Sequence, residues 1–296
     1  MHIAEYPLYR DFTTQEAIDA AYNPSHGRSD SAAILQAFTN RSAQARAQLE
    51  CRPDLKFGPT VDETLDFFPA EGQHSDSRPL HVFIHGGYWR SLSSKDFSYM
   101  AQGLAQAGVN VAVINYALCP KVTLGEIVRQ CRAALAWLYQ SAPELGFDRR
   151  NITVSGHSAG GHLLGMLLAT DWAADYALPA DLIRGGIAIS GLFDLGPFPW
   201  SWLQPKLQLT GRDVRELSPL FQPVQVNCPV LAAVGEQESD EFHRQSQAWV
   251  EHLVAAFPEQ SIEYLSVPAR DHFSIIDDLA AGEGPLMAAV RRQIGG

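Results

Sequence analysis

The spacing of apolar residues along the chain changes near residue 53. Before that point, residues 13–22 and 31–50 are rich in Ala, Gln, Glu and Arg, and Ile34, Leu35 and Phe38 follow helical spacing, so we expect two helices. After it, short β-rich runs alternate with helical segments. The pattern predicts eight strands, the first two joined by a short turn, at residues 55–57, 64–68, 80–85, 109–115, 152–155, 186–190, 229–234 and 262–267.

Two of the intervening helices carry clear sequence signals. Thr123 and Glu126 have capping-box spacing, in which the hydroxyl and the carboxylate each bind a free backbone N–H at the helix start. Apolar residues then mark one face of each helix: Ile127, Cys131, Leu135 and Leu138 in one, and Phe242, Trp249, Leu253 and Phe257 in the other, at 239–257. Alternating strands and helices predict an α/β fold with a mostly parallel sheet covered on both faces.

This organisation divides the chain into a helical N-terminal extension, residues 1–53, and an α/β domain, residues 54–296. Residues 191–225 interrupt the alternation between the sixth and seventh strands with a long segment rich in Pro and Trp. Such insertions usually form a lid or a wall of a substrate pocket. A surface helix with linkers is the alternative.

Composition narrows the classes of partner and compartment. The 296 residues carry a formal net charge of −11, which leaves no basic surplus to neutralise nucleic-acid phosphates. The N-terminal residues lack the features of a signal peptide, and no apolar run approaches the length of a membrane span. The cysteines are scattered, which favours free thiols and a cytoplasmic protein; they are Cys51, Cys119, Cys131 and Cys228.

The segment 151–161 is the strongest indication of chemistry. A strand-like run leads into Gly156-His-Ser158-Ala-Gly160, and a small-residue helical stretch follows. This order predicts a sharp turn that lifts the Ser158 hydroxyl out of the sheet as a nucleophile. The pattern alone is weak, because a glycine-rich chain can match it by chance.

A serine nucleophile needs a base and an acid that orients the base. His272 follows the last predicted strand and is the candidate base. The preceding strand ends near Gly235 and leads into four acidic residues, of which Glu238 is best placed to turn back towards His272. Asp240 is the alternative, although its position in the first turn of the next helix already explains a carboxylate there. His85 and His157 are interpreted as structural hydrogen-bonding residues.

The oxyanion donors are expected in the loop after the third strand. Gly86 and Gly87 let the backbone approach a ligand, so the N–H groups of Gly87 and Tyr88, with that of Ala159, could bind the developing negative charge. We find no metal-binding motif and no nucleotide-binding glycine loop, so neither a catalytic metal nor a cofactor is implied.

With these residues in place, the chain from about residue 50 onwards resembles α/β-hydrolases of the kynurenine formamidase (arylformamidase) and carboxylesterase group. The N-terminal Tyr-Arg-Asp-Phe and Tyr22-Asn-Pro24 are also similar to bacterial members. The shared elements are His85 to Trp89, Asn115-Tyr116 with Pro120, Gly156 to Gly160, Ser190-Gly191 with Asp194-Leu195, Ser218-Pro219, Glu241-Phe242 with Arg244-Gln-Ser246, and Asp271-His-Phe273.

The resemblance implies Ser158 as nucleophile, His272 as base and Glu238 as acid, although animal formamidases have Asp at that position. It implies hydrolysis of small acyl esters or N-formyl amides, with a small-molecule substrate and without nucleic acid or membrane as partner. The aromatic residues of the insertion depart from the group. Phe198, Trp200 and Trp202, together with Trp89, could line the substrate pocket, or they could pack the insertion. A broad carboxylesterase and a non-catalytic binding protein with a hydrolase fold remain alternatives.

Overall fold

The computed structural model describes residues 6–72, 77–223, 225 and 228–295. Residues 1–5 of the predicted extension and residue 224 of the predicted insertion lie outside this part. A single sheet contains eight strands: β1 (Arg52–Lys56), β2 (Thr64–Phe68), β3 (Leu80–Ile84), β4 (Asn110–Ile114), β5 (Ile152–His157), β6 (Gly185–Ile189), β7 (Val230–Gly235) and β8 (Ile262–Val267). The prediction of eight strands is confirmed.

The sheet is mixed but mostly parallel, with strand order β1-β2-β4-β3-β5-β6-β7-β8. β1 and β2 pair antiparallel to each other, and β2 pairs antiparallel to β4; from β4 to β8 all neighbours are parallel. The carboxyl ends of β3, β5, β7 and β8 therefore meet at one edge. In open α/β sheets this edge is where ligands bind.

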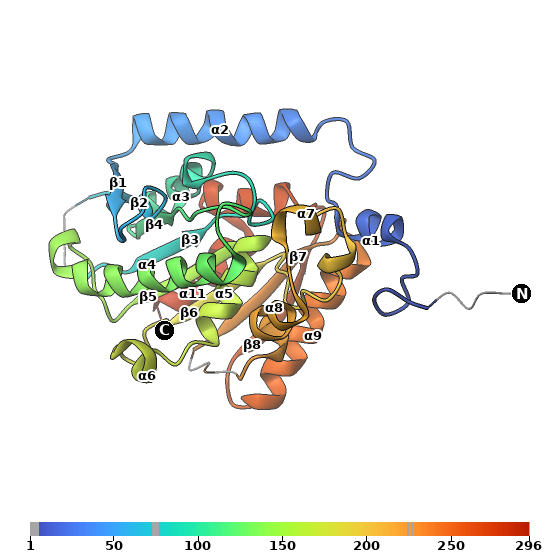
Figure 1. Cartoon of the computed structure of the whole chain (residues 1–296). Helices are drawn as coiled ribbons and strands as arrows, with labels where there is room; N and C mark the ends of the chain where they lie inside the picture. The colour runs from blue at the N-terminus through green and yellow to red at the C-terminus, as the bar shows by residue number, and fades with distance from the viewer. Residues whose placement is uncertain (1–5, 73–76, 224, 226–227, 296) are drawn as a thin grey trace, which may run out of the picture.

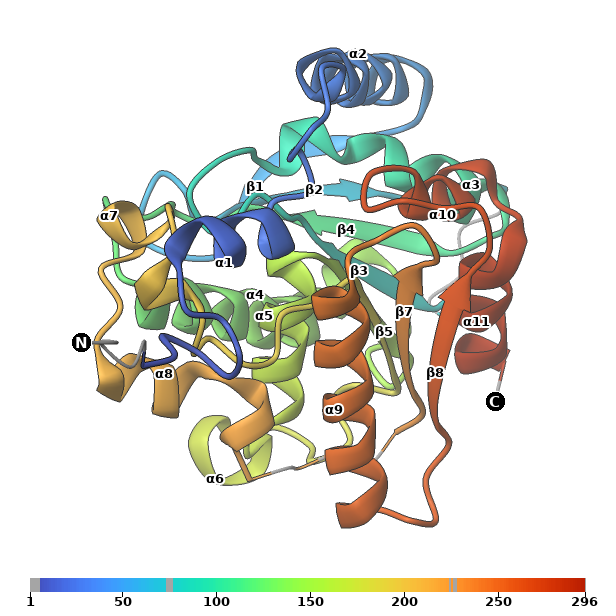
Figure 2. The same ribbon diagram turned by 90° about the vertical axis from the view of Figure 1, so that its right-hand side faces the viewer.

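Helices cover both faces of the sheet. α4 (Leu124–Leu145), α5 (Ala159–Leu168) and α9 (Asp240–Ala256) pack on one face, and α3 (Ala101–Gln106), α10 (Asp277–Ala281) and α11 (Gly284–Gly295) pack on the other. Figure 2 separates these layers, with α3, α10 and α11 together on one side of the sheet and α4 and α5 on the other. Strand residues alternate between the two layers: Val82 and Ile84 join the first and Phe83 the second.

The N-terminal extension forms two helices, α1 (Gln15–Tyr22) and α2 (Ser31–Gln48). α2 lies along the outside of the domain (Figure 1). Polar contacts fix it there: among them, Thr39 donates to Asp96 at 2.7 Å, Arg46 donates to the Lys95 carbonyl at 2.6 Å, and Arg41 pairs with Asp277 at 2.7 Å. The extension therefore packs on the α/β domain along most of its length.

The capping box predicted at the start of α4 is half formed. The Thr123 hydroxyl accepts from the Glu126 backbone N–H at 3.2 Å, as expected. The Glu126 carboxylate does not turn back to the helix start, because Arg129 and Gln130 on the same helix bind both of its oxygens. A charged guanidinium and a side-chain amide one turn away together outcompete a single backbone N–H.

The segment 191–225 contains only short helices: η3 (Phe198–Trp200), α7 (Gln204–Leu207), α8 (Gly211–Leu217) and η4 (Pro219–Phe221). Four further short helices lie elsewhere in the described chain. α6 (Trp172–Tyr176) precedes β6, and η5 (Ser274–Ile276) precedes α10. The other two, η1 (Ser94–Asp96) and η2 (Ser98–Met100), precede α3. Within the described residues, none of the helices combines the length and the apolar character that crossing a membrane requires.

Candidate active site

Ser158 lies at the turn between β5 and α5 in a strained backbone conformation, with φ 57° and ψ −117°. The flanking glycines make the turn possible. A Cβ at Gly156 would lie 2.0 Å from the Gly160 carbonyl oxygen, and a Cβ at Gly160 would lie 2.0 Å from that of Ile84. Because no side chain fits at either position, the spacing of glycines around Ser158 is a steric requirement of the turn.

Glu238 and His272 form a buried pair at the same edge of the sheet. The His272 Nδ1 lies 2.6 Å from a Glu238 carboxylate oxygen. The His272 side chain is 8% exposed and the Glu238 side chain is 1% exposed. The other Glu238 oxygen accepts from the Ser190 hydroxyl at 2.5 Å and from the Gly235 N–H at 2.8 Å. Both carboxylate oxygens are thus held, which fixes the direction of the imidazole ring.

Two loops carry this pair and are joined by backbone hydrogen bonds. The Gln237 N–H donates to the Arg270 carbonyl at 2.9 Å, and the Glu236 N–H donates to that of Val267 at 3.0 Å. Asp240, the alternative acid, is exposed in the first turn of α9. The carboxylate that faces His272 belongs to Glu238.

The remaining histidines of this region have structural contacts. His157 Nε2 lies 2.8 Å from the His272 carbonyl oxygen, and burial holds the pKa of His157 well below its usual range, so a neutral ring donates this bond. His85 Nδ1 lies 2.7 Å from the Gly86 carbonyl, and burial lowers the His85 pKa to about 4. Both placements agree with the interpretation of these residues as structural.

The loop after β3 packs directly against Ser158. A Cβ at Gly86 would lie 3.1 Å from the Ser158 Cβ, tighter than most real Cβ contacts, so a side chain at this position would displace its neighbours. Within the described chain, the N–H groups of Gly87, Tyr88 and Ala159 donate to no protein acceptor. Three free donors next to a serine are what an oxyanion hole requires.

Tyr88 and Trp89 anchor this loop. Both have positive φ, 50° and 55°. The Tyr88 hydroxyl donates to the Tyr22 carbonyl, and Trp89 Nε1 donates to His162 Nδ1 at 3.2 Å. Burial lowers the pKa of His162 to about 4, which keeps the accepting nitrogen unprotonated. The conformation of the loop is therefore fixed by packing on both sides.

A cavity of about 180 Å³ contains Ser158 and His272. No hydrogen bond joins the Ser158 hydroxyl to His272 in the structure, and such bonds often tighten only when substrate binds. The N-terminal extension supplies five lining residues: Asn23, Pro24, Ser25, Leu35 and Phe38. Sequence reasoning did not assign these residues to the pocket. The helical pattern of Leu35 and Phe38 indicates burial but not what they are buried against, and Asn23 to Ser25 lie in the loop between α1 and α2.

The expected pocket residues take other places, with one exception. Trp202 lines the cavity. Trp89 is fully buried against His162, Phe198 is fully buried against Tyr22 and Tyr88, and Trp200 is 48% exposed. The prediction that these three line the pocket is wrong, because Trp89 and Phe198 fill the space beneath the loop and Trp200 lies on the surface of η3.

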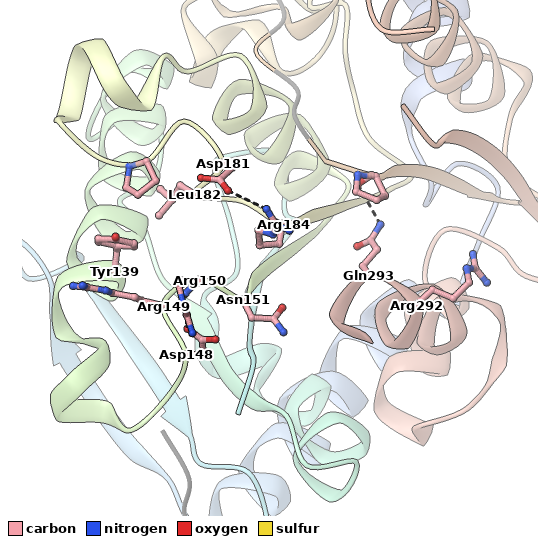
Figure 3. Close-up of a pocket in the computed structure, with 12 residues that line it drawn as sticks. Tyr139, Asp148, Arg149, Arg150, Asn151, Asp181, Leu182, Arg184, Arg292 and Gln293 are labelled. Carbon is pink, nitrogen blue, oxygen red and sulfur yellow. Dashed lines mark hydrogen bonds and ion pairs between the residues drawn. The ribbon is translucent and has the colours of Figure 1, made fainter. Parts of the chain in front are cut away.

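A larger cavity, about 640 Å³, lies at the opposite edge of the sheet. It is lined by the residues that immediately precede three parallel strands: Asn151, Arg184 and Pro229 (Figure 3). The length of β5 separates Asn151 from Ser158, roughly 20 Å at the usual rise of a strand. The larger cavity is therefore not the candidate site, because the candidate catalytic groups Ser158, Glu238 and His272 lie at the other edge of the sheet.

Comparisons with known proteins agree with this geometry. The kynurenine formamidase of Danio rerio is 29% identical over 268 residues, covering 89% of this chain and 88% of the relative. A proposed thioesterase from a Silicibacter species has a solved structure with TM-score 0.80 and 27% identity, covering 93% of this chain and 98% of that one. The chain is an α/β-hydrolase related to kynurenine formamidases and esterases.

Other relatives of this α/β-hydrolase are esterases. The BD-FAE family model matches residues 65–176. Esterase LipC of Mycobacterium tuberculosis is 25% identical, covering 81% of this chain and 63% of the relative. A thermostable carboxylesterase cloned from a metagenomic library shares the fold, with TM-score 0.70 and 16% identity over 92% of this chain and 98% of that one. The relatives are thus hydrolases of more than one type of bond.

Proposed function

We propose that this α/β-hydrolase cleaves small acyl esters or N-formyl amides of aromatic compounds through an acyl-enzyme intermediate. The observation that carries the proposal is the buried Glu238–His272 pair, whose His272 lines the same cavity as the strained Ser158 and as Gly87 and Tyr88, which have free N–H groups. The near full-length similarity to formamidases supports the same conclusion. The small cavity and its aromatic wall at Trp202 favour a small acyl group on a flat carrier.

In the proposed first step, His272 Nε2 removes the proton from Ser158, and the serine oxygen attacks the carbonyl carbon. The N–H groups of Gly87, Tyr88 and Ala159 bind the resulting oxyanion. Glu238 binds Nδ1–H and stabilises the imidazolium. When the tetrahedral intermediate collapses, His272 gives its proton to the departing alcohol or amine, and the acyl group remains on Ser158.

In the second step, neutral His272 removes a proton from water, and the hydroxide attacks the acyl-enzyme at the same carbonyl. The oxyanion again lies on the three N–H groups. Collapse returns the proton from His272 to the Ser158 oxygen and releases the acid, which is formate when the substrate is a formamide. The free Ser158 hydroxyl is restored.

The variant Ser158→Ala tests the nucleophile. We expect kcat to fall on the order of 10⁵-fold or more, because the attacking oxygen is lost while the Cβ that the turn accommodates is kept. Initial rates with an aryl acetate and with N-formyl-kynurenine measure the loss, and circular dichroism checks the fold. Wild-type activity in a correctly folded variant would refute the proposed mechanism.

A broad carboxylesterase is the second candidate, favoured by the BD-FAE match and by the esterase relatives. Comparing kcat/KM for N-formyl-kynurenine with kcat/KM for simple aryl acetates separates the two functions. A clear preference for the formamide, absent in Ser158→Ala, supports an arylformamidase. A preference for esters with negligible formamide cleavage supports the carboxylesterase.

A further inference from the structure

Arg90 is the charged residue of the catalytic cavity. It follows Trp89 in the loop that carries the candidate oxyanion donors, and its side chain is exposed to solvent. Of the described residues that line the cavity, it alone has a permanent charge, and none is Asp or Glu. The cavity therefore presents one positive charge at its solvent-exposed side and no negative charge.

The Arg90 guanidinium has no ion-pair partner among the described residues. Arg28, which lines a neighbouring cavity together with His272, differs in this respect: it pairs with Asp30 at 3.0 Å and with Asp271. Arg149, on the cavity at the opposite edge of the sheet, also has no ion-pair partner among the described residues. What distinguishes Arg90 is therefore its place on the wall of the cavity that Ser158 and His272 line.

The backbone around Arg90 is rigid. The N–H groups of Arg90 and Ser91 both donate to the Gly87 carbonyl at 3.1 Å, and the Trp89 carbonyl accepts from the Cys119 N–H at 2.8 Å. The Trp89 side chain is fully buried. The backbone of Arg90 is therefore held beside Gly87 and Tyr88, which restricts the region that its side chain can reach to the solvent-exposed side of the cavity.

We propose that Arg90 is a specificity-determining residue that binds a carboxylate on the substrate. The inference rests on the proposed function and narrows its substrate class to aromatic esters or formamides that carry a carboxylate on the aromatic part. A guanidinium is planar and binds both oxygens of a carboxylate with two parallel N–H donors. Because Arg90 is exposed to solvent and Ser158 is buried, the carboxylate would lie at the solvent-exposed side of the cavity and the scissile carbonyl at Ser158.

The experiment compares 4-acetoxybenzoate with its uncharged analogue 4-acetoxybenzamide. For the wild-type enzyme we expect kcat/KM to be higher for the carboxylate. In Arg90→Gln we expect that preference to fall roughly tenfold, the usual scale for a hydrogen bond to a charged group, with little change for the amide. Arg90→Lys should keep part of the preference, because the charge remains and the planar fork is lost.

Arg149→Gln is the matched control. It removes the same charge from the protein, but Arg149 lines the cavity at the opposite edge of the sheet (Figure 3). If the preference depended on net charge, both variants would lower it equally. We expect Arg149→Gln to behave as the wild type.

Equal substrate preference in wild type and Arg90→Gln would overturn the inference while the proposed function stands. An equal loss in Arg149→Gln would overturn it as well, because the effect would then be long-range. Failure of the wild type to hydrolyse either ester or any formamide would overturn the proposed function, and the role of Arg90 with it.

Discussion

At the scale of single residues, close contacts hold the Ser158 backbone and the Glu238 carboxylate in one conformation each. Ser158 keeps its strained backbone because the glycines on either side admit no Cβ. Glu238 has both carboxylate oxygens bound, by His272 on one side and by Ser190 and the Gly235 N–H on the other. An acid held in this way orients the imidazole before substrate arrives, which lowers the reorganisation that catalysis requires.

Glu238→Gln and Asp240→Asn test the assignment of the acid. We expect Glu238→Gln to lower kcat by about a thousandfold or more, because an amide can stabilise the wrong imidazole tautomer and cannot balance the imidazolium charge. Asp240→Asn should change kcat less than about twofold, since its exposed carboxylate acts only on the helix dipole. Steady-state kinetics with one aryl ester measures both, and a reversed order would assign the acid to Asp240.

At the scale of elements, the carboxyl ends of parallel strands bring the candidate catalytic residues together, while a helix outside the sheet forms part of the cavity wall. β3, β5, β7 and β8 lead into the four loops that carry the candidate oxyanion donors, Ser158, Glu238 and His272. α2 contributes Leu35 and Phe38 to the cavity wall. The sheet therefore positions the candidate catalytic groups, and α2 forms part of the cavity wall beside them.

Leu35→Ala is expected to widen the cavity. Because the side chain is only half-buried, its loss should open space without unfolding α2. The ratio of kcat/KM for butanoyl esters to kcat/KM for acetyl esters should then rise several-fold, because each methylene of the longer acyl group that becomes buried contributes about 0.8 kcal/mol. Ile34→Ala is the control, since Ile34 is also half-buried on α2 but does not line the cavity. The same rise in both variants would indicate a general loosening of α2.

At the scale of the whole molecule, contacts between distant parts of the chain enclose the site. Arg28 of the N-terminal extension pairs with Asp271, 243 residues away and adjacent to His272, and its guanidinium lies over the Phe273 ring at 5.4 Å. Tyr22 binds Glu241 and Gln245 on α9. The N-terminal segment thus connects directly to the loop of the candidate base.

The Arg28–Asp271 pair predicts a pH dependence of stability. Partial burial alone would raise the Asp271 pKa, but hydrogen bonds from Ser274 and Arg28 lower it to about 2 from an ordinary 3.8. A carboxyl with a lowered pKa in the folded state contributes stability that is complete above its unfolded pKa and is lost as pH falls towards 2. Arg28→Gln should remove part of this contribution.

Urea unfolding of wild type and Arg28→Gln between pH 6 and pH 3 measures this effect. We expect the difference in unfolding free energy to be largest at pH 6 and to shrink below about pH 4, where Asp271 in the unfolded chain becomes protonated. Arg212→Gln breaks an exposed pair with Glu216 on α8 and should show little difference at any pH. If the difference in unfolding free energy between wild type and Arg28→Gln stayed constant down to pH 3, the Asp271 charge would be excluded as its source.

The sequence by itself determined the features that depend on local rules. Strand periodicity predicts the eight strands, and the order of strand, glycine-flanked serine and helix predicts the turn at Ser158. Position after a strand selected Glu238 and His272, because loops at the carboxyl edge of a parallel sheet lie close together whatever their separation in sequence. These inferences need only local spacing and the topology of the sheet.

Only the tertiary structure decided what surrounds the reacting atoms. Trp89, Phe198 and Trp200 are aromatic residues near the site in sequence, yet two fill the core and one faces solvent, while Leu35 and Phe38 reach the cavity from the extension. Ser190 binds Glu238 although nothing in its local sequence requires this. Such contacts form between segments that are brought together only when the whole chain packs. Helical or strand periodicity predicts that a residue is buried, but it does not predict which residues it will contact.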